Sequence, residues 1–177
     1  MKKIYYSWQD VQGQALEIIR QISNDGWRPD YVVGLTRGGL VPANLISQYL
    51  KVPMETLKVS LRDDATAPEH NDWMANDAHG GYFDKENPKQ FMRRNILVVD
   101  DINDTGATLN WIKQDWQNSV ANIDSYWDQV WNENVRFATL VHNEASEFKC
   151  IDHYSVEINK AEEDLWIVFP WEDWWKK

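Results

Sequence analysis

A buried strand that ends in two carboxylates and then turns into a helix constrains this chain more than any other feature. Residues 96–99 are wholly apolar and rich in β-branched side chains, a composition typical of the middle of a parallel sheet. Asp100 and Asp101 follow directly, and residues 107–120 have the pattern of a helix. The run predicts a strand, loop and helix unit of an α/β sheet, with the loop at the carboxyl end of the strand.

The loop between this strand and helix has the composition of an anion-binding site. Thr105, Gly106, Ala107 and Thr108 are small, so their backbone N–H groups can surround phosphate oxygens at the start of a helix. Carboxylates beside such a loop would repel a bare phosphate, so we expect the two aspartates to accept hydrogen bonds from hydroxyl groups or to hold magnesium. Together these features predict a site for a sugar phosphate.

This run resembles the signature of the type I phosphoribosyltransferases, with two apolar residues, two aspartates and then Asp-Thr-Gly-x-Thr. The resemblance implies that Asp100 and Asp101 hold the ribose hydroxyls of 5-phosphoribosyl 1-pyrophosphate (PRPP) and, directly or indirectly, a magnesium ion. It also implies that residues 104–108 hold the 5-phosphate. Asp104 is our candidate for the group that takes a proton from the acceptor base, and its alternative role is to cap the following helix.

A second strand exit contains Thr36, Arg37 and Gly38, followed by another glycine. Glycine lets the backbone approach an anion, and the guanidinium can pair with phosphate in a bidentate manner. Taken alone, this motif is most often only a turn. The resemblance implies that these three residues bind pyrophosphate, and residues 37–42 are similar to the six-oxopurine branch of the family, the xanthine, guanine and hypoxanthine enzymes.

Residues 62–90 form a polar region too long for an ordinary connection in a compact domain. The resemblance implies a flexible hood that closes over PRPP, with Ser60 and Arg62 at its base touching pyrophosphate. His70 and His79 lie in this region without a recognised metal-ligand spacing, so we expect a solvated loop there rather than a zinc site.

The C-terminal residues 164–172 are similar to the base-binding strand of bacterial and archaeal six-oxopurine enzymes. This implies that Trp166 stacks on a purine and that backbone groups near Ile167 read its edge. We expect Trp171, Trp174 and Trp175 to be core aromatics instead. Asn143 stands where the family usually has a lysine that contacts the six-oxo group. An amide can donate but carries no charge, so the choice among hypoxanthine, guanine and xanthine stays open.

The order of apolar segments predicts one α/β domain over residues 1–177, with a doubly wound, mostly parallel sheet flanked by helices. Four buried strands are expected near residues 31–35, 52–61, 96–99 and 135–141, with helices after Ser7, over residues 40–50 and over residues 107–120. The tryptophan-rich residues 111–131 are expected to form an extended helix and loop that serves subunit contacts.

The net charge and the composition limit the classes of binding partner that this chain can have. The formal net charge of −10 disfavours nucleic acid and anionic membranes, because both are polyanions. The single cysteine, Cys150, cannot form an intramolecular disulfide, and no apolar run approaches membrane-spanning length. We therefore expect a cytoplasmic protein. The resemblance implies that it uses PRPP and a purine base, and we expect a homo-oligomer, a dimer or tetramer. Two alternatives stay open: a regulator that binds PRPP without turnover, and an enzyme for a pyrimidine base.

Overall fold

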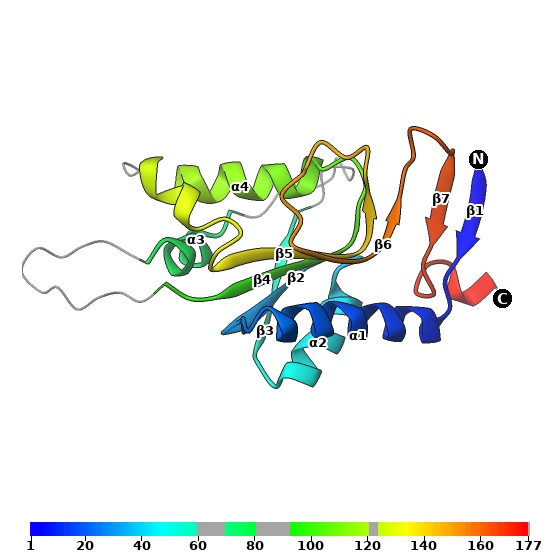
Figure 1. The fold of residues 1–177 in the computed structure, drawn as a ribbon, viewed down its shortest axis with the longest axis horizontal. Helices are drawn as coiled ribbons and strands as arrows, with labels where there is room; N and C mark the ends of the chain where they lie inside the picture. Colours follow the sequence, from blue (N-terminus) through cyan, green and yellow to red (C-terminus); the bar gives the residue numbers. More distant parts are fainter. Residues whose placement is uncertain (60–69, 81–92, 121–123, 177) are drawn as a thin grey trace, which may run out of the picture.

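The computed structural model describes residues 1–59, 70–80, 93–120 and 124–176. Within these residues, five parallel strands form a central sheet in the order β3-β2-β4-β5-β6 (Figure 1). The strands are β2 (Tyr31–Thr36), β3 (Met54–Lys58), β4 (Ile96–Asn103), β5 (Val135–Asn143) and β6 (His153–Ile158). The predicted parallel α/β sheet is confirmed, and β6 is a strand that the sequence patterns did not reveal.

Helices cover both faces of this sheet. Figure 1 shows α1 (Trp8–Asn24) and α2 (Leu40–Leu50) below it, and α3 (Asp72–His79) and α4 (Ala107–Ser119) above it. Two short 3-10 helices, η1 (Asp124–Gln129) and η2 (Trp174–Lys176), follow later in the chain. Each side of the sheet has its own apolar core, so the doubly wound arrangement is also confirmed.

Strand β4 shows how one strand serves both cores. Its first four residues are fully buried, with Ile96 and Val98 in the core beneath α4 and Leu97 and Val99 in the core beside α1 and α2. Successive side chains of a strand point to opposite faces, so a wholly apolar run fits a sheet that is covered on both sides. This burial fixes the register of β4 and with it the position of the polar residues at its carboxyl end.

A separate pair of parallel strands lies at the end of the molecule where both termini are found (Figure 1). Strand β1 (Lys2–Tyr5) pairs with β7 (Leu165–Val168), and Lys3 lies opposite Trp166 in the register. The terminal strand was predicted, but its pairing with the first residues of the chain was not. Alternation along β7 buries Leu165 and Ile167 and leaves Trp166 39% exposed.

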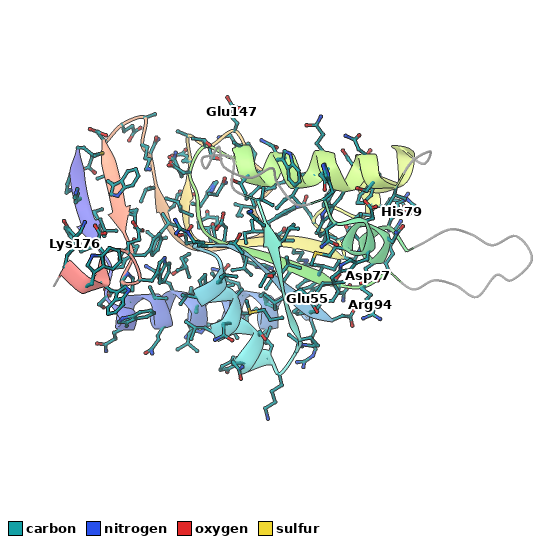
Figure 2. The ribbon with its side chains drawn as sticks, turned by 180° about the vertical axis from the view of Figure 1, so that it is seen from behind. Glu55, Asp77, His79, Arg94, Glu147 and Lys176 are labelled. Carbon is teal, nitrogen blue, oxygen red and sulfur yellow. The ribbon has the colours of Figure 1, made fainter. Side chains whose placement is uncertain are left out.

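Helix α3 lies inside the region predicted to be a solvated loop, so that prediction is wrong for residues 72–79. Met74, Ala75, Ala78 and His79 are buried against the core, and apolar burial at helical spacing explains why the segment folds. Figure 2 shows Asp77 on this helix and Arg94 beside it, and the Asp77 carboxylate accepts a hydrogen bond of 3.1 Å from the Tyr31 hydroxyl. Residues 60–69 and 81–90, which include Ser60 and Arg62 and most of the remaining predicted hood, lie outside the described residues.

One expectation about tryptophans is also corrected, because Trp174 and Trp175 are 66% and 64% exposed and are not core residues. Trp116 and Trp127 are buried and each stacks on the buried Trp131, so these three side chains fill the core under α4. A role of residues 111–131 in subunit contacts stays a prediction. Across the described ranges, none of the helices has the length and apolar character needed to cross a membrane.

Candidate active site

A pocket of about 210 Å³ opens at the carboxyl ends of β2 and β4. It brings together most of the residues that the two sequence motifs predicted. The lining residues come from the exit of β2, the residue after β3, the end of β4, the loop that follows it and the first turn of α4. They are Thr36, Gly38, Val59, Asp100, Asp101, Ile102, Asn103, Asp104, Thr105, Gly106, Ala107, Thr108 and Leu109. Ligands of doubly wound sheets bind at this edge, so the pocket is the candidate active site.

The loop that starts α4 is shaped by one glycine. Gly106 is the N-cap of the helix, has a left-handed backbone with φ of 87°, and supplies no side-chain cap. A β-carbon at this position would overlap the backbone nitrogen of Phe148, so only glycine fits. The backbone N–H groups of the first turn of α4 have no acceptor within the helix, and that of Ala107 donates to the Thr105 hydroxyl at 3.4 Å, so the start of α4 offers donors that suit an anion. The suggestion that Asp104 caps this helix is wrong.

A buried polar cluster supports the loop from below. Asn103 is 1% exposed, and its amide accepts a 2.8 Å hydrogen bond from the Ser146 hydroxyl and donates a 3.0 Å bond to the Phe148 carbonyl. The Ser146 oxygen accepts in turn from the backbone nitrogen of Phe148, and the Thr105 carbonyl accepts from the Glu147 nitrogen. These bonds fix the loop against the segment after β5. Sequence reasoning missed this cluster because neither Asn103 nor Ser146 belongs to a motif.

The two aspartates at the end of β4 are held against the backbone. Asp100 accepts a hydrogen bond of 3.0 Å from the nitrogen of Asp101, and Asp101 accepts one of 2.8 Å from the nitrogen of Ile102. Burial raises the pKa of Asp101 to about 6, against the lowering effect of these hydrogen bonds, and the nearby charge of Glu172 adds to the increase. A β-carbon at Gly38 would overlap the Asp101 carboxylate, so this glycine allows the exits of β2 and β4 to meet.

The acidic pair has the donor chemistry to hold a magnesium ion. Among the described residues, no group of three or more His, Cys, Asp or Glu side chains is placed to hold a metal. Magnesium commonly uses only one or two carboxylates and completes its shell with water and substrate phosphates. Asp100 and Asp101, beside a loop suited to phosphate, meet that requirement.

The predicted pyrophosphate residues are brought together only in part. Thr36 and Gly38 line the pocket, and the peptide bond between Thr36 and Arg37 is cis. The Arg37 side chain is exposed and does not line the pocket. Ser60 and Arg62 lie outside the described residues.

Lys160 is a pocket-side residue that sequence reasoning missed. It lies between β6 and β7, and its ammonium is 2.9 Å from the Asp104 carboxylate, with both side chains 19% exposed. The same ammonium lies over the Trp166 ring, 5.7 Å from its centre. In the sequence, Lys160 stands just before an acidic stretch that ends at Asp164. Such a stretch is typical of a solvated turn and does not indicate a binding site.

The predicted base-binding residues are arranged differently from expectation. The Ile167 side chain is buried in the core, so any contact with a base must come from its backbone. The side-chain oxygen of Asn143 accepts hydrogen bonds from the backbone nitrogens of Ala145 and Lys160, and its amide nitrogen donates one to the Asp104 carbonyl. Asn143 thus ties the loop after β4 to the segment that carries Lys160.

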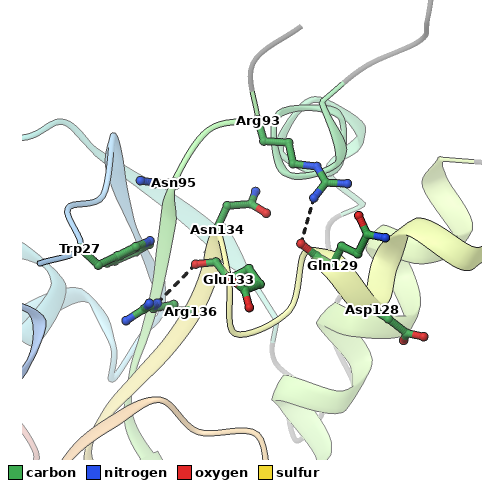
Figure 3. A pocket seen from close by; sticks show the side chains of 8 residues that line it. All are labelled: Trp27, Arg93, Asn95, Asp128, Gln129, Glu133, Asn134 and Arg136. Atoms are coloured by element: carbon green, nitrogen blue, oxygen red, sulfur yellow. Dashed lines mark hydrogen bonds between the residues drawn. The ribbon is translucent and has the colours of Figure 1, made fainter. Parts of the chain in front are cut away.

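A larger cavity of about 560 Å³ lies at the opposite, amino-terminal end of β4 and β5 (Figure 3). Its two arginines already serve the fold. Arg93 donates to the Gln129 carbonyl at 2.9 Å, and Arg136 donates to the Glu133 carbonyl and pairs with Asp25. Size therefore does not identify the functional pocket, whereas the polar chemistry at the other end of the sheet does.

Comparison with known proteins agrees with this geometry. The chain is 23% identical over 193 residues to hypoxanthine-guanine phosphoribosyltransferase of Schizosaccharomyces pombe, covering 96% of this chain and 89% of the relative. It is 26% identical over 185 residues to xanthine-guanine phosphoribosyltransferase of Cereibacter sphaeroides, covering 97% and 87%. The structure resembles purine phosphoribosyltransferase from Pyrococcus horikoshii, with a TM-score of 0.65, 24% identity and coverage of 98% and 95%.

A second solved structure, xanthine-guanine-hypoxanthine phosphoribosyltransferase of Helicobacter pylori, gives a TM-score of 0.64 at 18% identity, with coverage of 98% and 96%. At such identities these likenesses establish the fold. Residues 2–173 match the family described as "Phosphoribosyl transferase domain", which is nearly the whole chain. The chain therefore belongs to the phosphoribosyl transferase domain family.

Proposed function

We propose that this protein transfers the phosphoribosyl group of PRPP to a purine base, giving a nucleoside monophosphate and pyrophosphate. The observation that carries the proposal is the pocket in which the uncapped start of α4 lies beside Asp100 and Asp101, in a chain that belongs to this family. The names of the relatives described above, which contain hypoxanthine, guanine or xanthine, support a purine as the acceptor.

Each part of PRPP has a matching surface in the proposal. The N–H groups and hydroxyls of residues 104–108 receive the 5-phosphate, and Asp100 and Asp101 accept from the ribose hydroxyls. Backbone groups of Thr36 and Gly38 receive pyrophosphate, with the exposed Arg37 guanidinium available to reach it. The base lies against Trp166, where an indole face can stack on a purine.

The proposed reaction is a displacement at the anomeric carbon. A bond forms between a purine nitrogen and this carbon while the bond to the pyrophosphate oxygen breaks, and pyrophosphate leaves with the bonding electrons. The nitrogen's proton passes to the Asp104 carboxylate and then to solvent. Positive charge that develops on the ribose ring is stabilised by the adjacent carboxylates of Asp100 and Asp101.

Magnesium, held by Asp100 and Asp101 together with PRPP, would neutralise charge on the departing pyrophosphate. The protein's own residues fix the ribose and phosphate in one geometry, and this restriction supplies much of the rate enhancement in a bimolecular transfer. We also propose that the reaction takes place in the cytoplasm.

A base panel tests the proposal. Purified protein is mixed with PRPP, magnesium and one of hypoxanthine, guanine, xanthine, adenine, uracil or orotate, and the nucleoside monophosphate is measured by chromatography. We expect product with at least one six-oxopurine. Product only with uracil or orotate would identify a pyrimidine enzyme instead, and PRPP binding without product from any base would identify a regulator.

A further inference from the structure

The side chains around Asp104 form a cluster that the family motifs do not describe. The Lys160 ammonium lies between the Asp104 carboxylate, at 2.9 Å, and the Trp166 ring, at 5.7 Å from its centre. Asp104 lines the phosphate pocket and Trp166 lies on the exposed side of β7. Lys160 therefore links the phosphate loop to the surface on which a base would stack.

The side chain of Asn143 is already engaged by the backbone and does not take the place of the Lys160 ammonium. Its side-chain oxygen accepts from two backbone nitrogens, those of Ala145 and Lys160, at 3.2 and 3.0 Å. Its amide nitrogen donates to the Asp104 carbonyl at 2.9 Å. The residue is 5% exposed, so it acts as a buried clamp that holds Asp104 and Lys160 in place.

We propose that Lys160 is the residue that recognises the exocyclic oxygen of the base, an inference that rests on the proposed function. When a base stacks on Trp166 and one of its nitrogens faces Asp104, the edge of the base lies beside the Lys160 ammonium. An ammonium offers three donors and no acceptor, so it can bind a carbonyl oxygen but not an amino group. Lys160 therefore favours six-oxopurines over six-aminopurines.

A substitution of Lys160 tests this role and needs a check on stability. The Lys160 and Asp104 side chains are each 19% exposed, so removal of one partner can destabilise the fold, and thermal melts of each variant therefore accompany the binding measurements. Lys2 supplies a matched control, because its ammonium pairs with Glu163 near the same segment and is 65% exposed, away from the pocket. Lys160→Met and Lys2→Met change the net charge equally.

The test measures dissociation constants by calorimetry for inosine monophosphate, adenosine monophosphate and ribose 5-phosphate. Wild type and Lys2→Met should prefer inosine monophosphate. Lys160→Met should lower that preference by about tenfold to a hundredfold, which is the usual contribution of a hydrogen bond to a charged group. The affinity of the same variant for ribose 5-phosphate should stay unchanged.

An unchanged preference in Lys160→Met, with wild-type binding intact, would overturn this inference and leave the proposed function standing. A wild-type protein that binds neither nucleotide and yields no product in the base panel would overturn both. An equal loss for all three ligands would also overturn the inference, because it would show that Lys160 only holds the loop in shape.

Discussion

The phosphate end and the base end of the candidate site are built in different ways. At the phosphate end, backbone groups face the pocket, a left-handed glycine sets the turn, and the buried Asn103 and Ser146 side chains fix the loop. At the base end, side chains from separate segments do the work, with Lys160 between Asp104 and Trp166. Under the proposed function, we expect the first construction to bind an anion through the backbone and the second to determine the choice of base through individual side chains.

This difference predicts that substitutions at the phosphate end impair the reaction with every base, whereas those at the base end change the choice of base. Asp104 belongs to both ends, since its carbonyl is held by Asn143 and its carboxylate pairs with Lys160.

Loss of either carboxylate at the end of β4 should have the largest effect. Asp100→Asn and Asp101→Asn remove the negative charge beside the ribose and should each lower turnover by about a hundredfold or more, roughly 3 kcal/mol of transition-state stabilisation. Steady-state kinetics with PRPP and the best base of the panel would measure this. Near wild-type rates in both variants would remove the acidic pair from the reaction.

The glycine of the phosphate loop gives the next largest effect. Gly106→Ala adds a β-carbon where the Phe148 backbone lies and at a positive φ, and should reduce the free energy of unfolding by about 2 kcal/mol or more and weaken PRPP binding. Gly13→Ala in α1 is the matched control, since its β-carbon would meet open space. Similar melting temperatures and PRPP affinities in both variants would show that the loop is not set by this glycine.

Removal of the exposed indole on β7 should act on the base alone. Trp166→Ala should lose stacking worth about 1–3 kcal/mol and raise the KM for the purine far more than the KM for PRPP. Trp174→Ala removes a more exposed indole from η2, 66% against 39% for Trp166, and should change neither constant. If Trp166→Ala raised both constants equally, the indole would be a packing residue and the division between the two ends would fail.

The raised pKa of Asp101 gives a smaller effect that separates stability from activity. Because its pKa is about 6 in the folded protein and near 4 when unfolded, ionisation of Asp101 lowers stability as the pH rises from about 4 to 6. Asp101→Asn removes this cost and should be more stable than wild type by about 1–2 kcal/mol at pH 7.5, after allowance for solvent screening. The advantage should disappear near pH 4. Thermal melts at both pH values would measure it, and an equal difference at both would contradict the raised pKa.

The contrast between the two ends also explains what the sequence could predict. The strand, the acidic pair and the loop before α4 are neighbours in the chain, so their composition predicted the sheet and the pocket. The contacts of Ser146 and Lys160 join segments far apart in the chain, and no local pattern marks them. The sequence did not predict helix α3 because the helix has only eight residues and few apolar side chains. Its packing against the core of the sheet stabilises it, and this contact cannot be seen in the local sequence.

The most direct test of the account follows amide chemical shifts of isotope-labelled protein during titration with ribose 5-phosphate. We expect the largest shifts at Thr105, Gly106, Ala107 and Thr108, and we expect the signal of the Trp166 indole N–H to stay in place until a purine base is added. Large shifts around Arg93 and Arg136, in the cavity at the other end of the sheet, with an unmoved phosphate loop would contradict this expectation.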